Sequence, residues 1–427
     1  MNLPVDLTSS AQHTRDRGPA QPPSRSTRKE ENVPTEIPYL DGLRGFASLL
    51  VYIHHHVLWA HGSAHSVIER SFGYRQRYHF ITLPFVRIFF NGGHFGTACL
   101  FVLSGYVLSI KILRFHNVPV QTSSSTLARK IQLLDHVRSA IIRRWFRLYL
   151  PLFSTTFAQI TIVHLWKLPV SSFEPKATYI REIGALISEF LDFSFIFNRT
   201  ASPWLTYNDH LWSVPMEFQG SLVTLLLLLV VYGVSPYQRM AVYVVFITYF
   251  LVLVTDGWHC AFFIAGASIR DWETWSQMES HVLFTSKTTS RFVSNTLVIL
   301  GLYLGGVPTC VTTKCFRMNP GWQYLSGLSR IVRCDPKWIY LFLGSTLFFS
   351  SLRHTWLKKA VESGVFRGLA TMSYALYLTH GPVIQIFADF LYSLVGWPYG
   401  YRKIAHESFV SFQSARSLTS RDFANNG

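Results

Sequence analysis

The chain has 427 residues, of which 49% are hydrophobic, 15% aromatic and only 15% charged, and its mean hydropathy is positive. Soluble domains carry about 25% charged residues, so this composition argues against an ordinary soluble domain and favours a polytopic membrane protein. The net charge of +16 does not indicate nucleic-acid binding, because the basic residues cluster between apolar runs and no nucleic-acid-binding motif accompanies them.

The two ends of the chain differ from its centre. Residues 1–37 are rich in Ser, Thr, Pro and charge and contain no apolar core, which predicts a disordered cytosolic tail and not a signal peptide. We expect a transmembrane domain over 38–396. Residues 397–427 predict a polar C-terminal tail, because they contain no run long enough to cross a membrane again.

Nine apolar runs predict an all-α fold, a polytopic transmembrane helix bundle. These runs are 42–60, 92–112, 145–166, 211–234, 240–256, 258–270, 292–312, 338–352 and 366–395. The apolar segment 183–197 carries Glu189 and Asp192, which indicates an interfacial or re-entrant position. No internal repeat of the kind found in many transporters is visible.

Basic residues predict the orientation of the bundle. The connection from Lys111 to Arg147 is strongly basic, with Asp135 as its single acid, so the positive-inside rule places it and the N-terminus in the cytosol. Connection 167–210 then lies on the lumenal or extracellular side, where the sequon at Asn198 predicts glycosylation. We expect an integral protein of the endoplasmic reticulum or another endomembrane.

The five cysteines show no spacing typical of a metal site, so no metal is expected. Cys310, Cys315 and Cys334 lie close together in the sequence, and a disulfide among them is compatible with the pattern. The sequence does not determine its pairing.

The stretch LDGLRGFASLLVYIHHH, residues 40–56, places ionisable side chains in the first predicted span. Arg44 and His55 share one helix face, about 16 Å apart along the axis, whereas His54 and His56 point elsewhere. An arginine at a helix end can reach the interface without having a function. An imidazole near the midplane needs a cavity or a partner, so His55 is a candidate functional residue.

Two further motifs allow both a structural and a functional interpretation. In GHFGTACLFVLSGYVLSI, residues 93–110, the small residues favour tight helix packing, but Ser104 and Gly105 also leave room for a slender acyl or pantetheine chain. In RRWFRLYLP, Arg143 and Arg147 share a helix face from which Arg144 turns away. The three arginines within five positions fit both cytosolic anchoring and a clamp for phosphate oxygens.

Two motifs in the second half of the chain add further candidates. In HLWSVPMEF, His210 and Glu217 are nearly aligned and about 10 Å apart on a helix. A carboxylate in a membrane helix indicates a functional role or a buried pair, while His210 is equally compatible with a surface position. In MSYALYLTHGP, Ser373, Tyr377 and His380 follow one helix face, on which Tyr377 suits packing and His380 suits a cavity.

In this order and spacing, the five motifs resemble the acyltransferase 3 family of integral membrane acyltransferases, and the likeness runs over about residues 37–395. The chain is most similar to the compact fungal-type members. The resemblance implies transfer of an acyl group, often acetyl, from acyl-CoA to a hydroxyl of a sugar, lipid or small natural product. Acyl-CoA would be a co-substrate, and no tightly bound cofactor is expected. The family pattern has ten spans, so the polar tail stands where the tenth is expected.

The first family motif is an arginine followed, after ten residues, by an essential histidine, which corresponds to Arg44 and His55. By position, the resemblance implies catalysis by His55, His210 and Glu217, contact with CoA phosphates by Arg44, Arg143 and Arg147, and a functional late histidine at His380. We expect Ser104 and Tyr377 to line the cavity together with His380.

His55 could act as a general base that deprotonates the acceptor hydroxyl, or as a nucleophile that carries the acyl group. A proton-coupled transporter with a relay of Arg44, His55 and Glu217 is the alternative from another class, because intramembrane ionisable residues suit it equally well. The absence of repeats, the cytosolic arginines and the motif set favour the acyltransferase. A truncated, inactive chain with relic motifs is a third interpretation.

Overall fold

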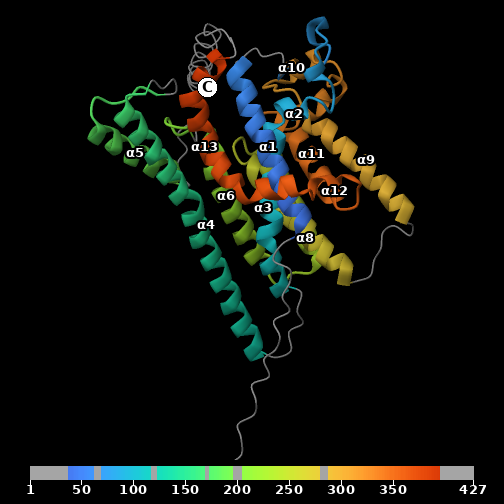
Figure 1. Ribbon diagram of the computed structural model, residues 1–427. Coiled ribbons are helices and arrows are strands. Elements are labelled where there is room, and N and C mark those ends of the chain that lie inside the picture. The colour runs from blue at the N-terminus through green and yellow to red at the C-terminus, as the bar shows by residue number, and fades with distance from the viewer. Residues whose placement is uncertain are drawn as a thin grey trace, which may run out of the picture. The chain divides into compact units, whose positions relative to one another are not determined.

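A computed structural model describes residues 37–61, 69–116, 123–168, 173–195, 204–278 and 287–394. The described residues from Pro38 onward belong to one compact unit and are all-α, with one isolated bridge between Leu205 and Asn208 as their only β pairing (Figure 1). The helices in chain order are α1 Pro38–His61, η2 Tyr74–Gln76, η3 Phe80–Thr82, α2 Ile88–Asn91, α3 Gly93–His116, α4 Ser123–Trp166, α5 Tyr179–Ser194, η4 Asp209–Trp212, α6 Ser213–Val230, α7 Pro236–Thr248, η5 Tyr249–Leu253, α8 Trp258–Met278, α9 Lys287–Gly305, α10 Thr313–Met318, η6 Tyr324–Arg330, α11 Lys337–Leu352, α12 Leu357–Val361 and α13 Gly364–Leu394.

Each of the nine predicted runs overlaps a helix, although α9 ends at Gly305 while its run continues to 312, and the prediction of an all-α fold is confirmed. In the part of the chain that the structure describes, four helical segments are long and apolar enough to cross a membrane: Gly93–His116, Leu127–Trp166, Asp209–Val230 and Pro236–Leu253. The chain is therefore an integral membrane helix bundle. Crossing of the membrane by the other five helices stays a prediction.

The largest difference from the predicted runs is the length of α4. Its 44 residues begin at Ser123, whereas the apolar run begins at 145, because a search for apolar runs does not detect a polar helical extension. At 1.5 Å per residue, α4 is about 66 Å long, roughly twice the hydrocarbon thickness of a bilayer. Leu133 and Val137 on the extension are buried and pack with residues of α3 and α6. The extension is thus part of the bundle.

The segment expected to be interfacial forms the amphipathic helix α5, which a buried carboxylate attaches to its surroundings. Glu182 accepts hydrogen bonds from the Tyr207 hydroxyl at 2.7 Å, from His164 Nε2 at 3.1 Å and from the Lys176 backbone N–H. Burial raises the pKa of Glu182, but these hydrogen bonds more than offset it and hold the pKa below its usual range. They join α4, α5 and the segment that leads into η4.

Helices α1 and α13 lie side by side and run in the same direction (Figure 1). Near their starts, the Phe46 and Phe366 rings are 5.5 Å apart, and a Cβ on Gly45 would lie 1.9 Å from the Phe366 carbonyl oxygen. Further along both helices, the rings of His55 and His380 are 5.1 Å apart. This parallel packing brings the late histidine of the sequence beside the early one.

Helix α3 runs antiparallel to α1. A Cβ on Gly96 would lie 2.6 Å from the Ala47 carbonyl oxygen, and a Cβ on Gly93 would lie 2.4 Å from the His54 ring. At Gly105, a Cβ would lie 1.9 Å from the Phe263 carbonyl oxygen of α8. The neighbouring backbone therefore fills the space beside Gly105, which supports the packing interpretation of the small residues at this position.

A disulfide links the residues just before and within α10. It joins Cys310 to Cys315, whose Cα atoms are 5.6 Å apart, while Cys334 is free and buried. Asn319 accepts a hydrogen bond from the Ser71 backbone N–H at 3.0 Å and donates one to the Cys315 carbonyl at 2.8 Å. The pairing that the sequence left open is therefore resolved, and the same loop anchors the segment that precedes η2.

Candidate active site

Three of the predicted histidines converge on one point in the bundle. The ring centroids of His55 on α1 and His210 in η4 are 4.2 Å apart, and each ring lies 5.1 Å from that of His380 on α13. One side-chain nitrogen from each residue lies within 4.8 Å of the other two. We call these three residues the histidine cluster.

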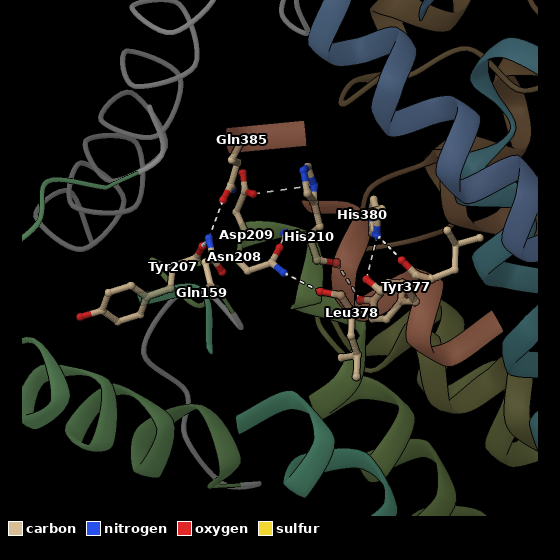
Figure 2. Close-up of polar contacts among 10 residues, drawn as sticks. Gln159, Tyr207, Asn208, Asp209, His210, Tyr377, Leu378, His380 and Gln385 are labelled. Carbon is tan, nitrogen blue, oxygen red and sulfur yellow. Dashed lines mark hydrogen bonds and ion pairs between the residues drawn. The ribbon is translucent and has the colours of Figure 1, made fainter. Parts of the chain in front are cut away.

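His210 is held in place through its backbone (Figure 2). The Tyr377 hydroxyl lies 2.6 Å from the His210 carbonyl oxygen and 2.8 Å from the Ser213 hydroxyl. The Asn208 side chain accepts from the His210 N–H at 3.3 Å and donates to the Leu378 carbonyl at 3.3 Å. Tyr377, predicted to line a cavity, thus joins α13 to the segment that carries His210.

The close approach of η4 to α13 requires a glycine after His380. A Cβ on Gly381 would lie 2.3 Å from the Asn208 side-chain oxygen and 2.8 Å from Cδ2 of His210. Both distances are far below a van der Waals contact, so any larger residue would push η4 away from the cluster.

His380 has a defined hydrogen-bonding pattern. Its Nδ1 lies 2.7 Å from the Tyr377 carbonyl oxygen and 3.1 Å from the Leu376 carbonyl oxygen. Carbonyl oxygens only accept, so Nδ1 carries the proton and Nε2 keeps its lone pair. Nε2 is buried and has no hydrogen-bond partner among the described residues. It is thus available to take a proton or bind a ligand.

A second polar cluster joins three other helices. Glu217 of α6 accepts a hydrogen bond from the Ser104 hydroxyl of α3 at 2.6 Å and forms an ion pair with Arg144 of α4. Since α3 is antiparallel to α1 with Gly96 opposite Ala47, Ser104 lies about 12 Å from that crossing, toward the Arg44 end of α1. This cluster and the histidine cluster therefore lie at different depths of the bundle.

The structure separates the arginines of the RRWFR motif. Arg143 is exposed and bonds to Ser139 on its own helix, and Arg147 is exposed as well. Arg44 is partly exposed, with its Nη1 3.2 Å from an Asp41 carboxylate oxygen. Arg144, the arginine predicted to turn away from the face of Arg143 and Arg147, is the one that reaches into the bundle.

The phase of the polar extension of α4 could have identified Arg144. Leu133 and Val137 are buried upstream and Leu152 is buried downstream. Arg144 is eleven and seven residues after the first two and eight before the third, so it shares their face. The expectation that the helix begins at 145 hid this periodicity.

A group of aromatic rings lies next to His54, the residue that precedes His55 of the histidine cluster. The rings of His54 and His94 are 5.3 Å apart, and His94 is 5.6 Å from Trp338. Trp258 stacks on Trp338 with centroids 3.4 Å apart, and Trp212 lies 6.4 Å from Trp338. Through His54, this aromatic group adjoins His55 of the histidine cluster in the sequence. It was not predicted, because its members come from distant segments.

The sequon at Asn198 and the tail 397–427 lie outside the described residues, so the predictions made for them stay predictions.

These features define the class of protein. It is an integral membrane helix bundle with a central histidine cluster and arginines at several levels. A family model described as an acyltransferase domain matches residues 37–405. The chain therefore belongs to the acyltransferase 3 family, and it is a membrane-bound transferase of acyl groups.

Curated relatives cover most of the chain at low identity. The chain is 24% identical to acyltransferase clz18 of Cochliobolus lunatus, over 89% of this chain and 88% of the relative. It is 24% identical to O-acetyltransferase PaAT-1 of Phomopsis amygdali, over 81% and 72%. It is also 24% identical to acyltransferase R4 of Phoma sp. (strain ATCC 20986 / MF5453), over 86% and 86%. No solved structure matches the chain.

Proposed function

We propose that this enzyme moves an acyl group, acetyl in the simplest case, from acyl-CoA to a hydroxyl of a sugar, lipid or small natural product. The observation that carries the proposal is the convergence of His55, His210 and His380 inside the bundle. A relative named as an O-acetyltransferase supports oxygen as the acceptor atom.

His55 is the proposed base. It takes the proton of the acceptor hydroxyl while the oxygen attacks the thioester carbonyl. The tetrahedral intermediate then collapses, the C–S bond breaks, and the CoA thiolate leaves and receives the proton from the imidazolium. In the second version of the mechanism, His55 attacks the thioester carbonyl, the C–S bond breaks and the CoA thiolate leaves. The acceptor hydroxyl then attacks the acyl-imidazole, the N–C bond breaks to free the imidazole, and the thiolate takes the proton of the hydroxyl. Both versions place the reacting carbonyl at the histidine cluster.

The donor enters from the end of α1 that carries Arg44. The spacing of about 16 Å along α1 between Arg44 and His55 suits a linear donor whose charged end stays near the interface while its thioester reaches the bundle interior. The exposed guanidinium groups of Arg143 and Arg147 are available to phosphate oxygens. In this proposal the protein lies in an endomembrane, and its arginines and N-terminus face the cytosol.

Glu217 and Ser104 lie on the Arg44 side of the histidine cluster, paired with Arg144. We assign Glu217 the role of fixing Arg144 and Ser104 beside the donor path. A direct role with a histidine is less well supported, because no hydrogen bond or ion pair joins Glu217 to the histidine cluster within the described residues. The absence of such a contact within the described residues also argues against a transporter relay, which would require a continuous chain of proton carriers.

The test is His55→Ala, assayed in membranes with labelled acetyl-CoA and an acceptor found by comparing metabolites of a deletion strain with the wild type. The expected result is loss of acyl transfer with unchanged abundance of the protein. The matched control is His136→Ala, since His136 is an exposed histidine on α4, and it should transfer acyl groups at the wild-type rate. Undiminished transfer by His55→Ala would overturn the proposal.

A further inference from the structure

The histidine cluster also has the composition of a metal site. It presents three imidazoles, one each from α1, η4 and α13, whose nitrogens lie within 4.8 Å of one another. Zn²⁺ binds histidine nitrogens at about 2.0–2.1 Å in tetrahedral geometry, which separates the ligand nitrogens by roughly 3.3 Å. Small rotations of the three side chains would therefore bring the nitrogens to metal-binding distance.

One of the three rings has a hydrogen-bonded partner of the kind that metal-binding histidines have, and a second ring has a carboxylate nearby. The Nδ1–H of His380 is bound by the Tyr377 carbonyl at 2.7 Å, so its Nε2 lone pair is fixed toward the cluster. Nε2 is buried without a partner among the described residues, and the side chain as a whole is only 3% exposed. For His210, an Asp209 carboxylate oxygen lies 3.7 Å from Nδ1 (Figure 2). Such carboxylate and carbonyl partners orient ligand imidazoles.

We propose that His55, His210 and His380 together bind one transition-metal cation of the Zn²⁺ class, with one coordination position left open, and that the bound cation inhibits acyl transfer. The inhibition rests on the proposed function, because the metal occupies the lone pair with which His55 acts on the hydroxyl or the thioester. The metal binding does not rest on it.

The ligand type sets the selectivity. Imidazole nitrogens suit Zn²⁺, Cu²⁺ and Ni²⁺, whereas Mg²⁺ and Ca²⁺ prefer oxygen ligands. Cu²⁺ and Zn²⁺ should therefore inhibit the enzyme at concentrations at which Mg²⁺ has no effect. This site could not be predicted from the sequence, because its ligands come from three distant segments and do not form a short motif.

The first experiment measures Zn²⁺ binding to the purified full-length protein in detergent by equilibrium dialysis and elemental analysis. One Zn²⁺ per chain is expected, with affinity roughly 10-fold lower in Asp209→Asn, since loss of an orienting partner costs about 10–100-fold, and lower still in His380→Ala, which removes a ligand. The controls His136→Ala and Asp135→Asn change exposed residues of α4 and should bind like the wild type. Equal binding by wild type and His380→Ala would overturn the site.

A second measurement needs no variant, which matters if His380→Ala fails to fold. The wild-type protein is treated with diethyl pyrocarbonate with and without Zn²⁺, and modified histidines are mapped by mass spectrometry. Zn²⁺ should protect His55, His210 and His380 and leave His136 reactive. Equal modification of the cluster with and without the metal would refute the proposal.

Acyl-transfer assays then separate the two proposals. If Zn²⁺ protects the cluster and transfer falls at least tenfold at saturation, both are supported. If Zn²⁺ protects the cluster but transfer is unchanged, the inhibition is refuted and the role of His55 with it. If Zn²⁺ does not bind while His55→Ala is inactive, the metal site is refuted and the proposed function stands.

Discussion

Tyr377 and Tyr374 form a matched pair for testing how the histidine cluster is positioned. Both lie on α13 and both bond through their hydroxyl groups to backbone carbonyls of other helices. The Tyr377 hydroxyl bonds to the carbonyl of His210, whereas the Tyr374 hydroxyl bonds to the carbonyl of Leu148 on α4. Only the first contact involves a residue of the cluster.

Tyr377→Phe removes one hydroxyl and leaves the ring in place. It leaves the His210 carbonyl and the Ser213 hydroxyl without that partner, and an unmade hydrogen bond at a buried group costs about 1–3 kcal/mol. If half of this cost, about 0.5–1.5 kcal/mol, falls on the position of His210 in the transition state, kcat/KM falls roughly two- to tenfold, since each 1.4 kcal/mol is a factor of ten. Tyr374→Phe should lose similar stability at Leu148 with little change in kcat/KM.

The assay is the initial rate of acyl transfer at several acceptor concentrations, together with the melting temperature of each purified variant. A fall in kcat for Tyr377→Phe alone, at equal loss of melting temperature in both variants, is the expected result. Equal rates in the two variants would refute the inference that the hydroxyl of Tyr377 positions the cluster.

Three further predictions concern the glycine at the cluster, the buried ion pair and an acid near the disulfide loop. Gly381→Ala should lower acyl transfer at least tenfold, measured with retained expression, because its Cβ would lie 2.8 Å from the His210 ring; full activity would show that η4 can shift without consequence. Glu217→Gln leaves Arg144 without its counter-charge and should cost about 1–3 kcal/mol in thermal unfolding, less than a fully buried pair because both side chains are about one-fifth exposed. The double variant with Arg144→Met should be more stable than Glu217→Gln alone, and a lower melting temperature of the double variant would contradict this. Burial raises the pKa of Glu69 from 4.5 to about 7, so the folded state holds its proton more tightly and the stability it confers falls as pH rises from about 4.5 through 7; the melting temperature of Glu69→Gln between pH 5 and 8 should vary less than that of the wild type, and parallel curves would refute the assignment.

Local periodicity predicted the positions of helices well, but not how far they extend beyond apolar segments. All nine predicted apolar runs overlap helices of the structure. A spanning or buried helix needs a continuous apolar stretch, and the sequence shows such a stretch directly. The polar half of α4 was missed, since its residues 123–144 bury only one face. That omission hid Arg144, whose inward direction follows from the phase of Leu133 and Val137.

The meeting of His55, His210 and His380 could not be predicted from spacing. Spacing along one helix determines which residues share a face. It therefore predicted His55 and His380 as separate candidates, each on its own helix. Their contact depends on the parallel packing of α1 against α13, and on Gly381 allowing η4 to approach. These are tertiary features, as is the choice of Cys315 and not Cys334 as the partner of Cys310.

Glu217 and Asp209 lie in different polar clusters. Their separation affects which carboxylate can stabilise a positive charge that develops on a histidine during the reaction. Glu217 is paired with Arg144 and Ser104, so its negative charge is already balanced and little of it can stabilise an imidazolium at the histidine cluster. Asp209 is the carboxylate beside the cluster, 3.7 Å from His210 Nδ1. A positive charge that develops on His55 is thus best stabilised by transfer toward His210, whose ring is 4.2 Å away. We propose that the two histidines act as a unit, in which His55 meets the substrate and His210, held by Tyr377, connects His55 to the carboxylate of Asp209.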